Sequence, residues 1–330
     1  MDDKIRIKVV GLGGFGLSTV ELMTKNVVGV DFLGLSNKHP IINDSNLTEK
    51  ILLGGGVTTN HSPELGKKRV LDSKEEITKS LEGYDVIIIV TALGFGTGTG
   101  GAPLVASIAK DLGAFTIGVC TTPFAFEGAN KDAVAKIGLF QLKAICDSVL
   151  VFSNQKLIKG NTRPQDGVEE KLLNVKNQIR YMVNSLVNIV NYSKGLSMDG
   201  FESLKHLFIA NKEMFFGCGA VMGEFQAVSA LRHAIKSDLL VTSFSNANRI
   251  LVTIDYKEEV SKETLDLLYD EIYNITGNEV DIIYTKSINP ESMGIFFISI
   301  FATGEDLKES NKITSDFDKL KDAINPNNFL

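Results

Sequence analysis

The sequence predicts an α/β fold in two parts: a larger domain built on a parallel sheet, then a long central helix and a smaller α+β domain. Three observations support this prediction. Short β-rich runs alternate with helical patterns through the first half of the chain. One long amphipathic segment follows, and a second alternation comes after it. The length of 330 residues is sufficient for two domains of ordinary size.

Five β-rich runs in the first half predict the strands of the parallel sheet. Each run is apolar on both faces, which is typical of strands covered by helices on both sides of a sheet. Each is followed by glycine, proline or polar residues, where a strand is expected to end. The predicted strands are residues 5–10, 32–36, 86–91, 115–120 and 149–153. We assign residues 1–168 to this domain.

The segment after this domain predicts one long helix. Apolar residues recur at intervals of three and four from Leu172 through Ile179 to Leu186, so they share one face of a helix. We assign residues 169–194 to this helix, which connects the two domains.

The remaining sequence predicts a mixed domain at residues 195–303 and a tail at residues 304–330. The tail is rich in polar and charged residues and has few large apolar ones, so we expect it to be flexible or to form a loose helix. The predicted strands of the second domain are residues 215–221, 250–255, 280–284 and 294–301. Its predicted helices are a short one that begins at Phe201 and two longer ones at residues 225–236 and 262–275.

The composition excludes several classes of protein. Hydrophobic residues at 44% and charged residues at 22% are typical of a soluble globular protein. The formal net charge of -6 argues against a nucleic-acid partner, because such binding depends on clustered Lys and Arg. No apolar run reaches the roughly 18 residues of a membrane span. We therefore expect a cytoplasmic protein with no direct nucleic-acid partner and no membrane insertion.

The three cysteines and four histidines are isolated from one another in the sequence. Their spacing matches neither a metal-ligand motif nor a disulfide framework. We therefore expect buried, reduced thiols at Cys120, Cys146 and Cys218, and we assign no metal to side-chain ligands.

A first glycine cluster follows the first predicted strand and opens a predicted helix. It consists of Gly11, Gly13, Gly14 and Gly16, with Ser18 in the helix that follows. Glycine lets backbone N–H groups approach an anion, and a helix N-terminus adds unpaired donors. A Rossmann dinucleotide-binding fold would have the same turn, but it needs an acidic residue about 20 positions further on. The second strand ends at Ser36-Asn37-Lys38 instead, so an NAD-dependent oxidoreductase remains only as an alternative.

A second glycine cluster is the more specific signal. It follows the predicted strand 86–91 and consists of Gly94, Phe95, Gly96, Thr97, Gly98, Thr99 and Gly100. A P-loop would end in Gly-Lys-Ser or Gly-Lys-Thr, whereas this cluster contains no lysine. Backbone amides and threonine hydroxyls are therefore the expected phosphate donors.

This second cluster resembles the signature loop of the FtsZ and tubulin family of GTPases. The resemblance extends to residues 121–128, 153–157 and 222–224, and together these matches cover roughly residues 4–303. It implies a tubulin/FtsZ-like fold, with a Rossmann-like parallel-sheet GTPase domain, a long central helix and a smaller α+β domain. It also implies GTP and GDP as ligands, Mg²⁺ as cofactor, and subunits that polymerise head-to-tail into filaments, with a role in cell division.

The resemblance also assigns roles to individual residues. It places Glu127 at the ribose and Lys131 near the phosphates, where the family usually has arginine. It places Asn154 and Asn177 at the base, and Leu172 where the family has an aromatic side chain that stacks on guanine. An alternative for Glu127 is a purely structural acid in the first turn of a helix.

An acidic segment falls where the family carries its catalytic loop, which enters the pocket of the next subunit. The matching positions here are Ser197, Asp199 and Glu202. Carboxylates suit this role because phosphoryl hydrolysis depends on positioning water and Mg²⁺. Asp199 and Glu202 also form a good capping box for a helix, and both roles are compatible. Ser197 in place of the family's asparagine leads us to expect slow hydrolysis. As a second departure, the loop at residues 54–60 looks shorter than the family's loop that senses the γ-phosphate.

Two other functions stay open within the same fold. One is a tubulin-like filament that segregates a plasmid or phage genome, and the other is a GTP-binding regulator that does not polymerise. Division or segregation adaptors are further expected partners of a filament.

Overall fold

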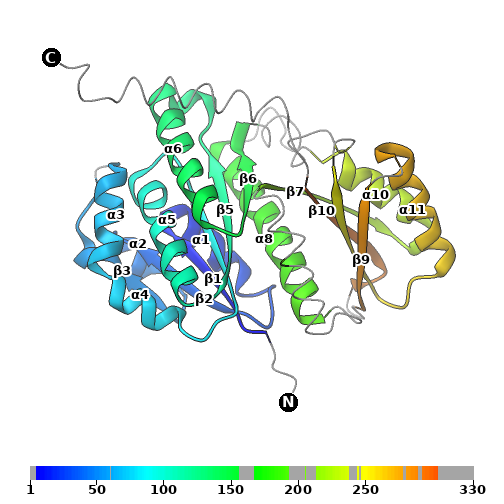
Figure 1. Ribbon diagram of the computed structural model, residues 1–330, viewed down its shortest axis with the longest axis horizontal. Coiled ribbons are helices and arrows are strands. Elements are labelled where there is room, and N and C mark those ends of the chain that lie inside the picture. The colour runs from blue at the N-terminus through cyan, green and yellow to red at the C-terminus, as the bar shows by residue number, and fades with distance from the viewer. Residues whose placement is uncertain are drawn as a thin grey trace.

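A computed structural model of the chain describes residues 5–59, 61–155, 167–192, 205, 213–237, 244, 247–277, 280–288 and 292–303. Two parts lie on either side of the long helix α8, Val168–Tyr192 (Figure 1). In these residues the strands form one ten-stranded sheet with the order β3-β2-β1-β4-β5-β6-β7-β10-β8-β9. The predicted fold class is therefore confirmed.

The strands of the first part are all parallel. They are β1 (Ile7–Leu12), β2 (Asp31–Ser36), β3 (Lys50–Leu52), β4 (Val86–Ala92), β5 (Phe115–Thr122) and β6 (Ser148–Ser153). The five predicted strands are present, and the three-residue strand β3 is an addition at the edge. All residues of β1 are buried. Because the strands run in parallel, their carboxyl ends meet at one edge of the sheet.

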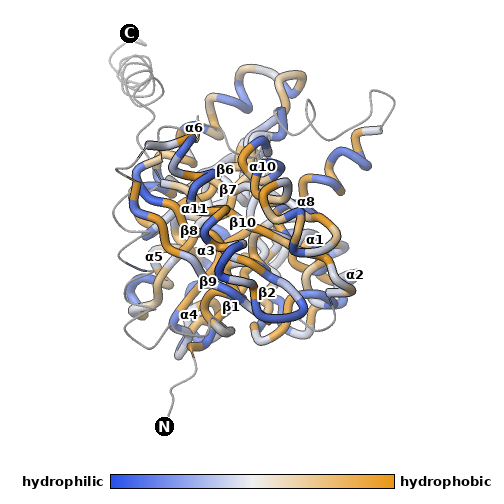
Figure 2. The backbone as a smooth tube through the Cα atoms, turned by 90° about the vertical axis from the view of Figure 1, so that its right-hand side faces the viewer, coloured by the Kyte–Doolittle hydropathy of each residue, from blue (hydrophilic) through white to orange (hydrophobic). Residues whose placement is uncertain are grey.

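Helices cover both faces of this sheet. They are α1 (Gly13–Met23), α2 (His39–Asp44), α3 (Pro63–Asp72), α4 (Lys74–Leu81), α5 (Gly96–Asp111) and α6 (Ala129–Ile145). Successive residues of β1 enter different cores: Val9 packs in the core that includes α1 and α8, and Val10 in the core that includes α4 and α5. In Figure 2 the central strands are mostly coloured as hydrophobic, and the outer helices alternate between the two colours.

The second part continues the same sheet with mixed strand directions. Its elements are β7 (Glu213–Met222), α10 (Ala227–Ile235), β8 (Arg249–Tyr256), α11 (Lys262–Thr276), β9 (Asp281–Ile288) and β10 (Ile295–Thr303). β10 is antiparallel to both β7 and β8, whereas β8 and β9 are parallel. Two residue pairs between β6 and β7 join the two parts of the sheet.

The helix α8 packs against both parts. Val175, Ile179, Met182 and Leu186 are buried in the core that it shares with the first sheet, which confirms the periodicity seen in the sequence. On another side of the helix, Ser185 forms a hydrogen bond of 2.7 Å with Ser299 of β10. The predicted helix boundary at residue 169 differs from the observed start by one residue. The predicted domain boundaries remain predictions.

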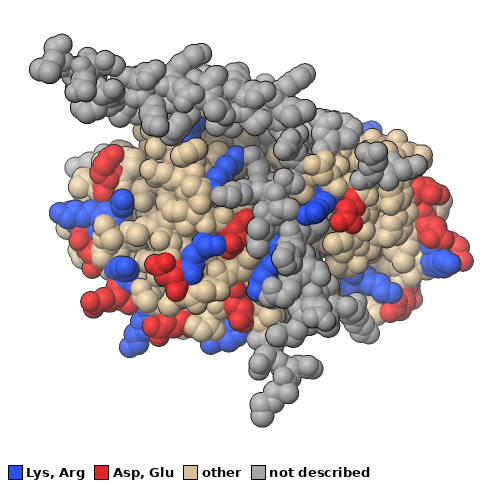
Figure 3. Space-filling view, in the orientation of Figure 1, with Lys and Arg blue, Asp and Glu red and all other residues tan. Residues whose placement is uncertain are grey.

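Several predicted features lie outside the described residues. They are the short helix from Phe201, the acidic segment with Ser197, Asp199 and Glu202, and the tail at residues 304–330. In the described part of the chain, no helix combines the length and apolar character needed to span a membrane. On the face shown in Figure 3, basic and acidic side chains of the described residues are interspersed.

The cysteine thiols are expected to be unreactive in the folded protein. Burial raises the pKa of Cys146 and of Cys218 to about 12, and Cys120 is fully buried. With a pKa near 12, about one thiol in 10⁴ is ionised at pH 8, against about a quarter for an ordinary cysteine. A chromogenic disulfide reagent at pH 8 should therefore label all three cysteines in urea and scarcely any in buffer.

The same shifts determine a direction for the pH dependence of stability. Because the folded pKa is raised, the unfolded chain loses these protons first. The contribution of the two protonated thiols to the stability of the fold is complete below about pH 8.5, and it is lost as the pH rises toward 12. The free energy of unfolding should therefore fall across that interval. Rapid labelling of native Cys146 or Cys218 at pH 8 would show that the pKa of that thiol is not raised in the folded protein.

Candidate functional site

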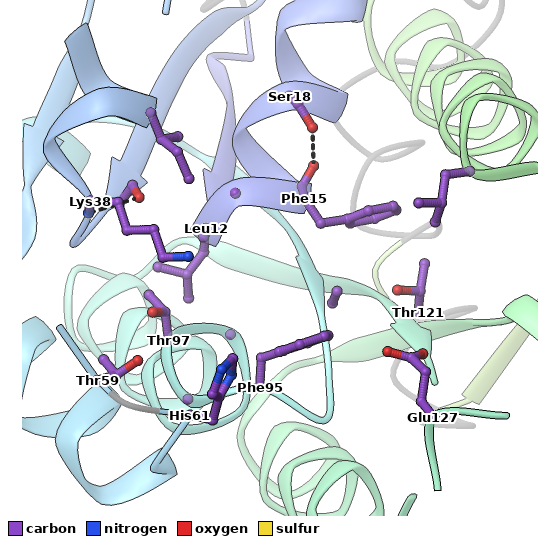
Figure 4. Close-up of a pocket in the computed structure, with 18 of the residues that line it drawn as sticks. Leu12, Phe15, Ser18, Lys38, Thr59, His61, Phe95, Thr97, Thr121 and Glu127 are labelled. Atoms are coloured by element: carbon purple, nitrogen blue, oxygen red, sulfur yellow. Dashed lines mark hydrogen bonds between the residues drawn. The ribbon is translucent and has the colours of Figure 1, made fainter. Parts of the chain in front are cut away.

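A cavity of about 700 Å³ lies at the carboxyl ends of the parallel strands. Its walls come from the segments after β1, β2, β4, β5 and β6, from Thr58, Thr59 and His61, and from the start of α8. In Figure 4, Lys38, Thr59 and His61 lie on one side of this cavity, and Thr121 and Glu127 lie on the other. The site therefore combines segments that are far apart in the sequence.

The first glycine cluster divides into two structural roles. β1 ends at Leu12, and α1 begins at Gly13, which has a φ of +75° and lines the cavity with Gly14 and Ser18. Gly11 and Gly16 do not line it. A Cβ atom on Gly16 would lie 2.2 Å from the carbonyl oxygen of Val90, so this glycine permits close packing of α1 on β4.

The second glycine cluster leads from β4 into α5. Gly94 has a φ of +95°, Phe95 is the N-cap residue, and Gly96 is the first residue of the helix. Phe95 provides no side-chain cap, and the first amides of a helix have no partner within the helix. Gly96, Thr97 and Gly98 line the cavity, so this end of α5 provides backbone donors and a favourable dipole for an anion.

Thr97, which lines the cavity, and Thr99 and Gly100, which do not, also support the loop itself. The Thr99 hydroxyl accepts a hydrogen bond of 2.9 Å from the Gly94 amide, and the Thr97 hydroxyl donates one of 2.7 Å to Asn37 Oδ1. A Cβ atom on Gly100 would lie 1.8 Å from the Pro63 carbonyl oxygen of α3. The alternating glycines thus serve helix packing as well as anion approach, a role that the sequence analysis did not anticipate.

Glu127 lines the cavity but is already engaged by its neighbours. Its Oε2 accepts a hydrogen bond of 2.8 Å from the Phe124 amide, and its Oε1 lies 3.1 Å from Lys131 Nζ. The ammonium of Lys131 also lies 4.1 Å from the centroid of the Phe95 ring. Lys131 is not among the residues that line the cavity. Phe95 thus takes part in a cation–π contact at the entrance to the glycine loop.

Asn154 marks one end of the cavity. It is 6% exposed, and its Oδ1 has no hydrogen-bond partner in the described part of the chain. A buried polar atom without a partner is costly, so a ligand that donates to it is a physical explanation for its placement. Val168, Leu172 and Lys176 from the start of α8 line the same cavity.

Asn177 is not among the lining residues, whereas its neighbour Lys176 is. One residue along a helix rotates the side chain by about 100°, so the two positions face different directions. Burial lowers the pKa of Lys176, and Glu21 opposes that shift. The sequence signal for Lys176 is its spacing of four residues from Leu172 on the same helix face.

The opposite end of the cavity contains residues that the sequence analysis did not single out as ligands. They are Asn37 and Lys38 after β2, and Thr58, Thr59 and His61 before α3. Asn37 donates from Nδ2 to the carbonyl oxygen of Val57 at 3.2 Å, which links these two segments. The signals for them were a polar strand end at Ser36-Asn37-Lys38 and a histidine beside a glycine-rich loop.

The residues present fit a nucleotide. Two helix N-termini opened by glycine suit the phosphates, and the buried amide of Asn154 suits a base. For a metal ion, no group of three or more His, Cys, Asp and Glu side chains gathers within the described ranges.

The fold and the site define an α/β protein in which two glycine-rich turns at the carboxyl edge of a parallel sheet suit the binding of an anion. Comparison with known proteins identifies the family. The model of the Tubulin/FtsZ family, GTPase domain, matches residues 6–162, and that of the FtsZ family, C-terminal domain, matches residues 213–306. The chain belongs to the Tubulin/FtsZ family and contains a GTPase domain of that family. The resemblance inferred from the sequence is confirmed.

Individual relatives are similar over most of the chain. Cell division protein FtsZ of Mycoplasmopsis pulmonis (strain UAB CTIP) is 32% identical over 324 residues, which cover 96% of this chain and 81% of that protein. An empty FtsZ dimer of M. jannaschii has a TM-score of 0.82 at 26% identity, with 91% of this chain and 88% of that chain covered. GDP-bound CetZ1 of Haloferax volcanii has a TM-score of 0.82 at 17% identity, with 95% and 100% covered, and shows a shared fold.

Proposed function

We propose that this chain binds GTP, hydrolyses it to GDP and phosphate, and polymerises head-to-tail into filaments that act in cell division. The observation that supports this most is the cavity between two glycine-opened helix N-termini and the buried, unpartnered oxygen of Asn154. The 32% identity to a cell division protein FtsZ supports the cellular role. Cytoplasmic location and GTP with Mg²⁺ as cofactors belong to the same proposal.

The phosphates of GTP would lie between the N-termini of α1 and α5. Gly13, Gly14, Gly96, Thr97 and Gly98 line the cavity there, and their backbone amides can donate to phosphate oxygens without a lysine in the loop. The base would lie toward Asn154 and α8, and the ribose beside Glu127. Neutral donors hold the nucleotide without neutralising its charge, which leaves that task to Mg²⁺ and nearby cations.

The catalytic acids would come from a neighbouring subunit. Among the described residues that line the cavity, Glu127 is the one carboxylate, and it already contacts Phe124 and Lys131. A water molecule that attacks the terminal phosphate needs a group that orients it. Asp199 and Glu202 of the next molecule are our candidates for that group.

Two exposed apolar surfaces support head-to-tail assembly. One is the rim of the cavity, where Phe126 is 68% exposed and Val168 is also exposed. The other, which we call the distal patch, consists of Met222, Phe225, Met293 and Ile295. Phe225 is 85% exposed and Met293 86%, and such clusters typically mark contacts with other proteins.

The rim and the distal patch lie far apart along α8. Val168 at the start of the helix lines the cavity, whereas Phe297 of β10 packs against Tyr181, with 6.0 Å between the ring centroids, and shares a small second cavity with Asn188. The thirteen residues from Val168 to Tyr181 correspond to about 20 Å of helix. Ile295, two residues before Phe297, pairs directly with Met222 of β7. A contact between two different surfaces of identical molecules does not close into a two-fold dimer, and it produces an open filament when its rotation does not close into a ring.

The double substitution of Phe225 and Met293 by serine should weaken assembly without affecting nucleotide binding. Losing two large apolar side chains from a contact should raise the critical concentration for polymerisation about 10-fold or more. Sedimentation with GTP measures this, and fluorescent GTP measures binding. Leu267→Ser on α11 is the matched control, since it removes an exposed apolar side chain elsewhere. Equal pelleting of the double variant and the control would contradict the assignment.

Two experiments test the proposed function as a whole. The protein should bind fluorescent GTP and not NADH, which separates it from an oxidoreductase. It should pellet with GTP and not with GDP, and electron microscopy should show filaments. Binding without pelleting would instead favour the non-polymerising regulator. A fluorescent fusion at the division site would favour division, and one that follows plasmid or phage DNA would favour segregation.

A further inference from the structure

We infer that residues 313–324 dock as an amphipathic helix in a groove between α3, α5 and α6 of the same molecule. The groove is separate from the nucleotide cavity, so this inference does not rest on the proposed function. The docked segment would bridge α3 and α5, which both begin beside that cavity.

The groove has a volume of about 510 Å³, and α5 forms its floor between α3 and α6. Figure 1 shows these three helices next to one another, and their buried residues share one core, so they cover the same face of the sheet. On the floor, Gly100, Pro103 and Ser107 are small and lie on one side of α5. Lys67 of α3 and Ile145 of α6 form parts of the two walls. A channel of this kind between helices suits the apolar face of another helix.

The sequence of the tail contains one segment with the pattern of an amphipathic helix. Its apolar residues, which we call the apolar stripe, are Ile313, Phe317, Leu320 and Ile324. They are spaced by four, three and four positions, so they share one helix face. Pro326 follows two residues later, where a helix is expected to end. An isolated helix of about 12 residues is marginal in water, so this one needs a surface that covers its apolar stripe.

The end of β10 lies close enough to the groove for the segment to reach it. Thr303 pairs with Met214 of β7, and Met214 pairs with Leu150 of β6, so Thr303 lies about 10 Å from Leu150. Ile145 of the groove is five residues before Leu150, which adds at most about 18 Å. Residues 304–312 can span about 30 Å when extended. The segment that follows them can therefore enter the groove of its own molecule.

The groove matches the segment in apolar surface and in charge. Phe140 on α6, next to a residue that lines the groove, is 48% exposed and extends its apolar surface. On the other wall, Lys67 is exposed. Asp316, four residues before Leu320, lies at one edge of the apolar stripe. It can therefore pair with Lys67 when Phe317 and Leu320 enter the groove.

A single tryptophan in the tail tests this inference, because the chain contains none. In the full chain without nucleotide, Phe317→Trp should place the indole in the groove and shift its emission to shorter wavelength. Acrylamide should quench it about threefold less than the indole of Ser315→Trp, because a docked indole loses most of its exposed surface. Ser315 is the matched control, since it lies on the opposite face of the same segment.

A second substitution tests whether the groove is the docking surface. Ser107→Arg places a long side chain on the floor of the groove, so adding it to Phe317→Trp should raise the quenching to the level of Ser315→Trp. Glu75→Arg at an exposed position of α4 is the control that should leave the quenching low. Thermal melting shows whether each variant is folded. Gln141→Arg, at an exposed position of the same groove, gives the same test if Ser107→Arg does not fold.

Three results would overturn the inference. Equal quenching of Phe317→Trp and Ser315→Trp would show that the stripe is not covered. Low quenching that persists in folded Ser107→Arg or Gln141→Arg protein would show that the segment docks elsewhere. Quenching that rises on dilution of the protein would show that the segment docks in another molecule instead of its own.

Discussion

Replacement of Gly66 by alanine is expected to destabilise the protein by about 3 kcal/mol and to abolish nucleotide binding. Gly66 lies within α3, and a Cβ atom there would be 2.0 Å from the carbonyl oxygen of Gly96 and 3.1 Å from the Cα atom of Thr97. Both contacts are with backbone atoms, which cannot rotate away as the end of a side chain would. The added methyl group must therefore push α3 away from α5 or distort the phosphate loop.

The expected loss of stability is opposite in sign to the change that helix propensity predicts. Alanine favours a helix over glycine by about 1 kcal/mol, so helix propensity alone predicts a more stable protein. Urea unfolding measures the free energy of unfolding, and fluorescent GTP measures binding. Gly167→Ala is the matched control, because a Cβ atom at Gly167 meets no atom within 4 Å. A Gly66→Ala protein as stable as wild type, with normal GTP affinity, would show that the two helices pack less closely than described.

The main features of the fold could be predicted from the sequence because they depend on local patterns. A strand buried on both faces is mostly apolar, as in β4, where the first five residues are Val or Ile. In a helix with one buried face, the apolar residues recur every three or four positions, as in α8. β3 was missed because a strand of three residues, Lys50–Leu52, is too short to show a period.

The candidate site could be predicted only in part. The glycine clusters were visible because a turn and the helix after it are adjacent in sequence. The sequence did not show which glycines permit close helix packing and which line the cavity. Such packing depends on distant residues: Gly66 and Gly96, which approach closely, are 30 residues apart. Lys38 and His61 were missed for the same reason: Asn37 and Thr97, whose hydrogen bond brings the segments together, are separated by 60 residues.

Replacement of Asp199 by alanine is expected to lower the rate of GTP turnover about 100-fold or more while leaving GTP binding intact. The expectation follows from the proposed interface site, in which the cavity holds the nucleotide and an acid of the next subunit orients the water. Filaments should still form with GTP and should persist, because their loss depends on hydrolysis. Phosphate release and sedimentation over time measure the two effects. Asp111→Ala at the exposed end of α5 is the matched control.

A mixing experiment tests whether the acid acts on the neighbouring subunit. The Asp199→Ala variant is loaded with labelled GTP and mixed with excess wild-type protein in the presence of excess unlabelled GTP, which prevents wild-type pockets from capturing the label. If the acid acts across the interface, wild-type neighbours supply it, and the label bound to the variant is hydrolysed at close to the wild-type rate. If Asp199 acts within its own subunit, that label stays as GTP until it dissociates. Persistent labelled GTP in mixed filaments would therefore refute the interface assignment while leaving the role of Asp199 in hydrolysis in place.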